Sequence, residues 1–374
     1  MNRKRVVVAG LGDVGILAAM RLVRHAEVVG ISVKPGLVSG QELGVRLSRP
    51  RDWARDYWIP FDKFRRLDRV RIIQGSLTGV DLAAKTVSGN LDDGTTFTEG
   101  YDAMVVSTGV SNGFWRRPTL QSAADIGGDL GAAHGQLAAA RSVIVVGGGA
   151  AAVSSAANMA TTWPNKRVDL YFPGERALLG YHPKIWQRIR GRLNDLGVGL
   201  HPGHRAAIDD GFAGDEITSG PVQWTTGQPP ASAEAVLWAV GRVQPNTDWL
   251  PAELLEENGF VRVTPELAVP GAQGVFAAGD VAATDPLRSS ARNRGDALVA
   301  HNIRAEFEGR PLRSYRPPGR RWGSLLGIQR NGLEVFLPTG QRFRLPSWSV
   351  QRIVMPLVVR RGMYGGVREN HPSI

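Results

Sequence analysis

Three glycines close to the N-terminus have the spacing of a phosphate-binding turn. Gly10, Gly12 and Gly15 follow the apolar run 6–9 and precede apolar residues at helical spacing. In such a turn the first glycine permits the tight bend, the second lets backbone N–H groups approach a pyrophosphate, and the third lets the next helix pack on the strand. A strand–helix connection can carry these glycines by chance, so the assignment needs a second element.

The second element lies in the middle of the chain, where the apolar run 143–146 leads into another glycine-rich turn. Its members are Gly147, Gly148, Gly149 and Ala152, and small residues therefore occupy all three key places. Two complete strand–turn–helix units in one chain are hard to attribute to chance. They predict an α/β fold with two Rossmann-like dinucleotide-binding domains, together with a small C-terminal α+β region.

Neither unit has the acidic residue that usually binds the adenosine ribose at the end of the second strand. The first unit ends this strand at Val33 and Lys34, so ribose recognition there needs backbone groups, Ser32 or another element, and Lys34 is a candidate cofactor contact. The second unit ends it at Phe172, with Arg176 nearby. Without a carboxylate to repel a 2′-phosphate, NADPH suits this site at least as well as NADH, although Arg176 equally fits a solvated loop charge.

Other strand ends carry residues that suit a flavin. One buried strand ends at Thr108, which offers a hydroxyl, and Gly109, which lets the chain pass close to a ligand. Another ends at Gly279 and Asp280, whose carboxylate can accept a hydroxyl of a cofactor's sugar-alcohol chain. Each ending also fits a plain turn. Gly241 marks a further strand end, where we expect the chain to cross back to the first domain.

The composition excludes several kinds of redox and metal chemistry. The 374 residues include no cysteine, which rules out disulfides, cysteine-based zinc sites, iron–sulfur clusters and thiol relays. His182, His201 and His204 lack convincing metal-ligand spacing and fit surface or capping positions better, so we expect no metal site. No apolar run approaches 18 residues, and we expect a soluble or surface-bound protein of the cytoplasm.

The net charge of +11 is concentrated at the C-terminal end. Residues 310–374 contain twelve arginines and two glutamates, whereas the preceding 309 residues are nearly neutral. The three short runs over 325–345 are joined by Asn-Gly and Thr-Gly and predict two hairpins. A cationic segment of this kind is expected to meet an anionic partner.

An apolar stripe follows the predicted hairpins. It consists of Val350, Ile353, Val354, Leu357 and Val358, which fall on one helical face. Such a segment can lie on the anionic inner face of a membrane, with Trp348 at the boundary. Packing against the protein's own core or against the second copy of a homodimer is the alternative, and Pro356 would bend a helix here.

Taken in order, these features resemble the two-dinucleotide-binding-domain flavoprotein oxidoreductases. The chain looks most like type II NADH dehydrogenases and the apoptosis-inducing-factor-like NAD(P)H:quinone oxidoreductases, over essentially its full length. The resemblance implies FAD contacts at Gly10, Gly12, Gly15, Thr108, Gly109, Gly279 and Asp280, and NAD(P)H contacts at Gly147, Gly149 and Ala152, with Gly241 at the domain crossover.

The resemblance also implies a domain plan and a reaction. We expect a FAD-binding domain of residues 1–110 and 236–309, split around an NAD(P)H-binding domain of residues 111–235, and a basic C-terminal domain over 310–374. FAD would be bound non-covalently. It would take hydride from NAD(P)H and pass electrons to a quinone-like planar acceptor. The absence of cysteine separates the chain from disulfide reductases and sulfide:quinone reductases, which need sulfur nucleophiles.

The chain departs from the resemblance near the flavin. A Val-Glu pair is usual where this chain has Val153 and Ser154, and a glutamine is expected near 292–294, where this chain has arginines. No catalytic side chain is firmly assigned for this reason. Arg288 is a candidate for stabilising anionic reduced flavin, with a solvated arginine at a helix start as the alternative.

Two other functions remain open on the sequence alone. A reductase that feeds a small acidic electron carrier would use the cationic C-terminal region as a docking surface. A nucleotide-sensing or nucleic-acid-binding flavoprotein would also suit the charge, but no nucleic-acid-binding motif is present.

Overall fold

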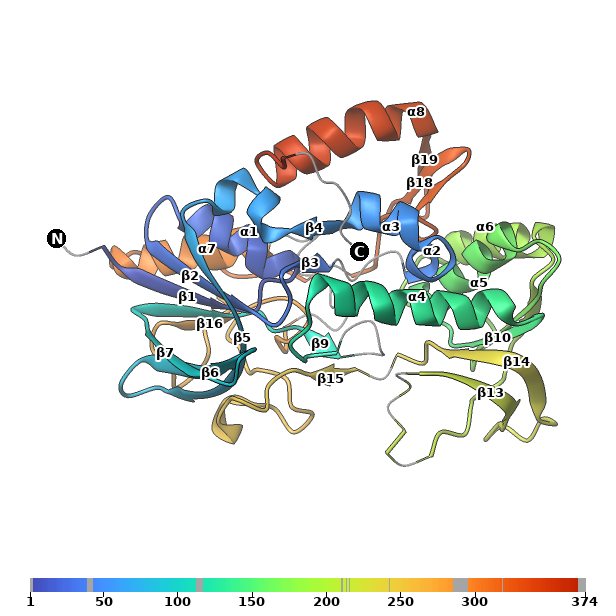
Figure 1. Cartoon of the computed structure of the whole chain (residues 1–374), viewed down its shortest axis with the longest axis horizontal. Coiled ribbons are helices and arrows are strands. Elements are labelled where there is room, and N and C mark those ends of the chain that lie inside the picture. The colour runs from blue at the N-terminus through green and yellow to red at the C-terminus, as the bar shows by residue number, and fades with distance from the viewer. Residues whose placement is uncertain are drawn as a thin grey trace.

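Two sheets with parallel strands at their centres organise the chain, and they lie at opposite ends of the molecule in Figure 1. The structure, a computed structural model, describes residues 3–38, 43–111, 117–209, 211–212, 214, 216–241, 243–284, 295–317 and 319–368. Within these ranges the α/β fold with two dinucleotide-binding units is confirmed.

The larger sheet carries the first glycine-rich turn. Its spatial order is β16 (Val275–Ala277), β8 (Ala103–Val106), β1 (Arg5–Ala9), β2 (Glu27–Ser32), β5 (Val70–Asp81), β6 (Thr86–Leu91) and β7 (Thr96–Gly100). The apolar run of β1 pairs in parallel with β2 and β8 and is almost completely buried, as expected of a strand covered on both faces. Helices α1 (Asp13–Leu22) and α7 (Gly295–Phe307) pack on one face of the sheet.

Strand β5 joins two parts of this sheet. It runs parallel to β2 at first and antiparallel to β6 beyond, with an irregularity in register between Leu77 and Gly79. Gly75 and Gly79 both lie inside this one strand. The antiparallel pairs β5–β6 and β6–β7 are therefore continuous with the parallel part of the sheet.

The smaller sheet carries the second glycine-rich turn. Its order is β12 (Gly199–His201), β11 (Arg167–Tyr171), β10 (Ser142–Val146), β14 (Ala231–Trp238) and β13 (Ile217–Val222). Helices α4 (Ala123–Ala139), α5 (Ala150–Thr162) and α6 (Pro183–Asp195) cover one face, as Figure 1 shows. The predicted boundary at residue 235 falls inside β14, because this strand continues to Trp238 beside β10.

Two short strands connect the halves of the molecule. β9 (Val110–Ser111) leaves the larger sheet and β15 (Gln244–Pro245) returns from the smaller one, and the two pair antiparallel. Asn246 reinforces this crossing, since its side-chain amide donates to the carbonyl of Thr108 and its side-chain oxygen accepts from Ser111 Oγ. Both interdomain passages are thereby tied together.

The segment after β2 belongs to both halves. β3 (Gly36–Val38), α2 (Leu43–Ser48), α3 (Pro50–Tyr57) and β4 (Trp58–Pro60) follow one another, with the short turns η1 (Phe61–Lys63) and η2 (Arg65–Leu67) leading to β5. The buried Trp53 and Trp58 share one apolar cluster with α4 and α5. Residues 43–58, predicted as part of the FAD domain, therefore pack on the helices of the other half.

The C-terminal region forms the predicted hairpins and a long helix. β17 (Ile328–Gln329), β18 (Gly332–Phe336) and β19 (Arg342–Leu345) are antiparallel, which confirms the hairpins. After α8 (Ser347–Ser349), the π-helix η5 (Val350–Met363) includes Pro356 within its length. This helix lies along the upper edge of the molecule in Figure 1.

The apolar stripe of η5 is only partly covered. Val350 is buried, but Ile353, Leu357 and Val358 are 43%, 51% and 55% exposed. The protein's own core therefore covers Val350 but leaves these three side chains partly accessible. Tyr364, directly after the helix, is buried edge-on against Phe64, with ring centroids 5.2 Å apart. Across the described ranges, no helix is long and apolar enough to cross a membrane.

Candidate active site

One large cavity brings the two glycine-rich turns together. It has a volume of about 1010 Å³, and its wall includes Gly10, Gly12, Gly148 and Gly149 from the two turns. The ends of the parallel strands supply the rest of the central wall, where crevices of doubly wound sheets bind ligands. The wall also includes Lys34, Thr108, Gly109, Arg176, Gly241, Gly279 and Asp280.

The first turn is closed toward the protein and open toward the cavity. Gly10 has φ +96°, and a Cβ built there would lie 2.5 Å from the carbonyl oxygen of Ser107. A Cβ at Gly15 would lie 1.8 Å from the Gly10 carbonyl oxygen, so helix α1 needs glycine to approach the turn. At Gly12 no heavy atom lies within 4 Å of the Cβ position. This open side at the N-terminus of α1 fits a pyrophosphate.

The second turn repeats this geometry. Gly147 has φ +142°, and its Cβ position lies 2.1 Å from the Ala239 carbonyl oxygen. Ala152 is completely buried behind the turn, and a Cβ at Gly147 would lie 3.3 Å from its methyl carbon. Gly149 has no heavy atom within 4 Å of its Cβ position and lines the cavity. Both turns therefore fit a dinucleotide phosphate.

The strand ends differ in what they offer a ligand. The hydroxyl of Thr108 donates to the carbonyl oxygen of Asn246 at 2.8 Å, so its hydrogen is engaged within the protein and only its lone pairs are left for a ligand. Gly109, Gly241 and Gly279 have φ of +71°, +75° and +89°, conformations that favour glycine. Asp280 lines the cavity.

Lys34 occupies the place where an acid was expected. Its ammonium group donates to the carbonyl oxygen of Thr119 at 2.9 Å and to Oε1 of Gln121. Burial lowers the pKa of Lys34 to about 8, and the nearby Asp129 only partly offsets this effect. Lys34 lines the cavity, and with this pKa its side chain is charged below about pH 8.

The other predicted cations have different positions. Arg176 lines the cavity, but its guanidinium also makes long contacts of 3.4–3.5 Å with the carbonyl oxygens of Leu178, Leu179 and Tyr181. Arg288, like the arginines at 292 and 294, lies outside the described residues.

In the part of the chain that is described, no group of three His, Asp or Glu side chains could hold a metal ion.

The C-terminal region supplies a wall that the sequence did not predict. Arg321, Trp322, Ser324 and Leu325 line the cavity, and the backbone N–H of Arg321 donates to the Gly180 carbonyl oxygen at 2.9 Å. These residues carry no motif, because their role depends on where the chain returns after α7. The site is therefore built from all three predicted regions.

The fold and the cavity define a protein with two Rossmann-like units whose glycine-rich turns share one cavity. A family model described as pyridine nucleotide-disulphide oxidoreductase matches residues 4–302. The chain belongs to this family, which confirms FAD and NAD(P)H as its cofactors.

Comparison with individual proteins shows how far the likeness extends. The chain is 30% identical over 121 residues to Oxidoreductase ptaL of Pestalotiopsis fici, and the match spans 31% of this chain and 30% of that protein. It thus spans less than a third of the length of the curated relative it matches.

Solved structures share the fold at low sequence identity. The sulfide:quinone oxidoreductase of Aquifex aeolicus is similar with a TM-score of 0.71 at 16% identity, covering 97% of this chain and 92% of that one. The water-forming NADH oxidase of Lactobacillus brevis gives a TM-score of 0.62 at 19% identity, covering 83% and 71% of the two chains.

Proposed function

We propose that the chain oxidises NAD(P)H and delivers the electrons through FAD to a quinone-like acceptor. The observation that carries the proposal is the absence of cysteine from the whole sequence. Without a thiol relay, electrons must pass directly from flavin to acceptor. A planar quinone that can lie close to the flavin suits this direct transfer.

The chain's own part in this reaction is binding and orientation. The N–H groups at Gly10–Gly12 and the N-terminus of α1 would hold the FAD pyrophosphate, and Asp280 would accept a hydroxyl of the ribityl chain. The turn at Gly147–Gly149 would hold the NAD(P)H pyrophosphate, with Arg176 available to a 2′-phosphate. When bound, FAD accepts a hydride and later releases electrons. One NAD(P)H, one proton and one quinone give NAD(P)⁺ and quinol.

Rapid-mixing spectroscopy tests the acceptor. The FAD-loaded protein is reduced with NADH or NADPH, and the reduced flavin is then mixed anaerobically with ubiquinone or menaquinone analogues. We expect reoxidation by quinone to be faster than reoxidation by oxygen in a parallel experiment. If no quinone reoxidises the flavin faster than oxygen does, the quinone assignment is wrong.

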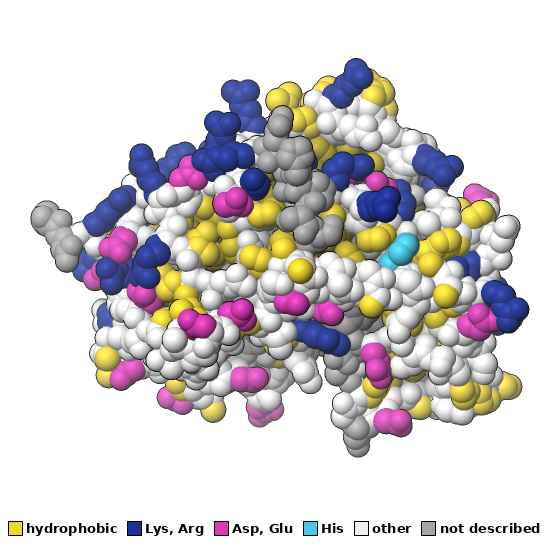
Figure 2. Space-filling view, viewed as in Figure 1, with side chains coloured by type: hydrophobic (Ala, Val, Ile, Leu, Met, Phe, Trp, Pro, Cys, Tyr) yellow, Lys and Arg dark blue, Asp and Glu magenta, His cyan; other side chains and the backbone are white. Residues whose placement is uncertain are grey.

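We further propose that the enzyme works at an anionic membrane surface. Trp348, Ile353, Leu357, Val358 and Met363 are exposed apolar side chains of the C-terminal helix region, and cationic side chains surround it. Figure 2 shows hydrophobic and basic side chains together along this upper edge, whereas acidic side chains predominate along the lower one. A long-chain quinone stays in lipid, so its reductase must reach the surface. A homodimer through the same face is the alternative, which light scattering would detect.

The same basic edge supports a second candidate function. A small acidic electron-carrier protein would be steered toward a cationic surface, and its association would weaken with salt. Salt-sensitive binding to an acidic ferredoxin or flavodoxin, without binding to liposomes, would favour this carrier over a quinone.

A further inference from the structure

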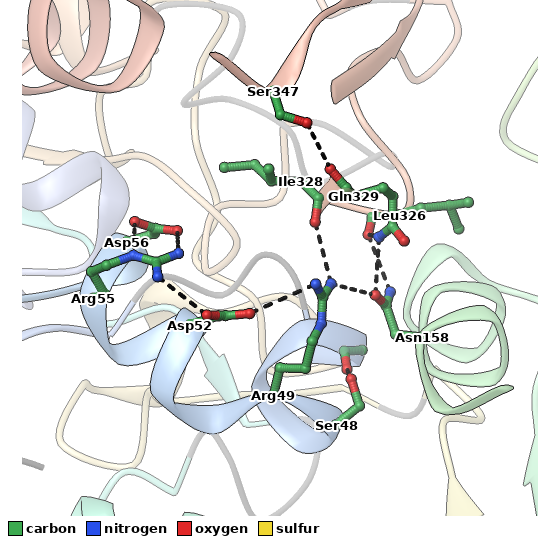
Figure 3. Close-up of polar contacts among 11 residues, drawn as sticks. Ser48, Arg49, Asp52, Arg55, Asp56, Asn158, Leu326, Ile328, Gln329 and Ser347 are labelled. Carbon is green, nitrogen blue, oxygen red and sulfur yellow. Dashed lines mark hydrogen bonds and ion pairs between the residues drawn. The ribbon is translucent and has the colours of Figure 1, made fainter. Parts of the chain in front are cut away.

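A buried amide near the cavity connects three distant segments. Asn158 lies on α5 with 1% of its surface exposed. Figure 3 shows it between Arg49, at the start of α3, and Leu326 and Gln329 of the C-terminal region. Because a buried amide is costly unless its hydrogen bonds are made, its partners determine its orientation.

The hydrogen bonds leave Asn158 one orientation. Its Oδ1 accepts from Arg49 Nη2 at 2.9 Å and from Gln329 Nε2 at 3.0 Å. Its Nδ2 therefore faces the other way and donates to the carbonyl oxygens of Ser154 at 2.9 Å and Leu326 at 3.1 Å. A flipped amide would place its NH₂ group against two donors.

This orientation fixes the role of the Ser154 hydroxyl. Asn158 Nδ2 also lies 3.3 Å from Ser154 Oγ, and an amide nitrogen can only donate, so Oγ is the acceptor of this contact. Within the described parts of the chain, Ser154 Oγ donates to no acceptor. Thr161 on the same helix behaves differently, since its hydroxyl donates to the Ala157 carbonyl oxygen. Ser154 thus keeps an unused hydroxyl hydrogen.

Ser154 also lines the cavity that the two glycine-rich turns share. It is one turn further along α5 than Ala150, and both residues line the cavity. Leu43 of α2 lines the cavity as well, and a Cβ at the adjacent Gly44 would lie 2.7 Å from Ser154 Oγ. Glycine at position 44 is what allows α2 to lie this close to the Ser154 side chain.

We propose that Ser154 donates its hydroxyl hydrogen to the carboxamide oxygen of the nicotinamide ring, with Asn158 as the positioning residue. The inference rests on NAD(P)H binding at the Gly147–Gly149 turn, from which α5 leads to Ser154. The nicotinamide must reach the junction of the two sites to meet the flavin. Its carboxamide carbonyl is the acceptor that an unused donor at this point would take up.

The C-terminal region takes part in this arrangement. Gln329 contributes one donor to Asn158, and Leu326 contributes one acceptor. Arg49, the second donor, is itself held by the Ile328 carbonyl oxygen at 3.2 Å and by Asp52. Residues 326–329 thereby hold Asn158, which in turn contacts Ser154.

A ligand that lacks the carboxamide oxygen tests the proposal. The FAD-loaded enzyme is titrated with NAD⁺ and with thionicotinamide adenine dinucleotide, in which sulfur, a weak acceptor, replaces that oxygen. Dissociation constants come from the change in flavin absorbance, without turnover. One hydrogen bond predicts that the wild type prefers NAD⁺ by about 2- to 10-fold and that Ser154→Ala removes this preference.

Two further variants separate positioning from packing. Ser155→Ala is the matched control, because Ser155 is fully buried on the same helix and its hydroxyl has no partner among the described residues. It should keep the preference for NAD⁺. Asn158→Asp should lose it, because a carboxylate would take the Ser154 hydrogen for itself.

The outcomes decide the proposal clearly. A preference that persists in Ser154→Ala, or a wild type that binds both nucleotides equally, overturns it. The Ser154→Ala result stands on its own if Asn158→Asp does not fold. A wild type that binds neither nucleotide overturns the proposal together with the nucleotide site, whereas failure with quinones leaves these titrations unaffected.

Discussion

A substitution at Gly12 is expected to weaken FAD binding without changing the stability of the fold. Its φ of −76° suits alanine, and no protein atom lies within 4 Å of the added methyl group. We therefore expect Gly12→Ala to leave the thermal midpoint of the apoprotein within about 2 °C, since no named source of strain is introduced. The methyl group would occupy the space of the pyrophosphate and weaken FAD binding at least tenfold. Calorimetry and flavin fluorescence measure the two effects.

Gly149 allows the same experiment at the second site. Gly149→Ala, with φ −87° and open space around the methyl group, should keep its FAD and raise the dissociation constant for NAD⁺ at least tenfold. Gly12→Ala and Gly149→Ala are thus controls for each other. If Gly149→Ala binds NAD⁺ like the wild type, the second turn does not hold the nucleotide's phosphates.

Lys34 predicts a pH dependence of FAD binding. Burial lowers its pKa to about 8 from 10.5, so the charge is present below pH 8 and is lost as the pH rises through this value. If the ammonium contacts FAD, affinity should fall between about pH 7 and 9 in the wild type and be flat in Lys34→Met. Lys184→Met, an exposed lysine on α6, should behave like the wild type. A pH profile unchanged by Lys34→Met would exclude the contact.

Lys34 affects the stability of the apoprotein in the opposite direction: this contribution increases as the pH rises. A lysine whose pKa is lower in the folded than in the unfolded chain contributes stability that is present above the unfolded pKa and lost as the pH falls through the folded one. Lys34 therefore favours the apoprotein fold at high pH, over the window from about 8 to 10.5. Fluorescence titration of FAD and urea unfolding of the apoprotein distinguish the two effects.

At the scale of elements, helices α2 and α5 approach each other so closely at Gly44 that no side chain fits at this position. A Cβ at Gly44 would lie 2.3 Å from the Ser154 carbonyl oxygen, which is backbone and cannot rotate away. We expect Gly44→Ala to destabilise the protein by about 1–3 kcal/mol, as overpacked cores do. Gly131→Ala on the exposed face of α4, with nothing within 4 Å, should instead stabilise it by about 0.5–1 kcal/mol. Urea unfolding compares the two, and equal midpoints would contradict the close approach.

Helices and strands could be predicted where one local sequence pattern was enough to identify them. The buried valines of β1 and β10 and the glycines after them were readable because strand, turn and helix occur within 20 residues of each other. Helices α2 to α4 were missed, since α4 contains four glycines and α2 is buried on all six residues, which removes helical periodicity. Asn158 and Asn246 carry no motif, and contacts between distant segments alone reveal their roles.

At the scale of the whole molecule, side chains of opposite charge lie on different edges. Basic and apolar side chains share the edge formed by η5, and acidic side chains lie mainly along the opposite edge (Figure 2). The charge of the C-terminal region was readable from the sequence, but the exposure of its apolar side chains was not. The exposure of these side chains depends on the π-helix around Pro356. It also depends on Tyr364, which packs into the apolar cluster of the larger sheet and so fixes the end of the helix.

This polarity predicts binding to anionic membranes through η5. Each arginine near an anionic leaflet contributes about 1 kcal/mol, and inserted apolar side chains add to it. The protein should sediment with anionic liposomes, not with neutral ones, and dissociate as salt shortens the screening length. Replacing Ile353, Leu357 and Val358 by serine should weaken binding at least tenfold without changing the thermal midpoint, because all three are exposed.

Two variants that each lose one arginine, at different places on the surface, serve as the control for this experiment. Arg352→Ser removes a cation from the exposed surface of η5, and Arg190→Ser removes one from exposed α6 on the other half of the molecule. Both variants lose one unit of net charge, so a general attraction between a basic protein and an anionic surface would weaken equally in the two. Docking through η5 requires a larger loss for Arg352→Ser. Equal losses, or a triple serine variant that sediments like the wild type, would show that η5 does not face the membrane.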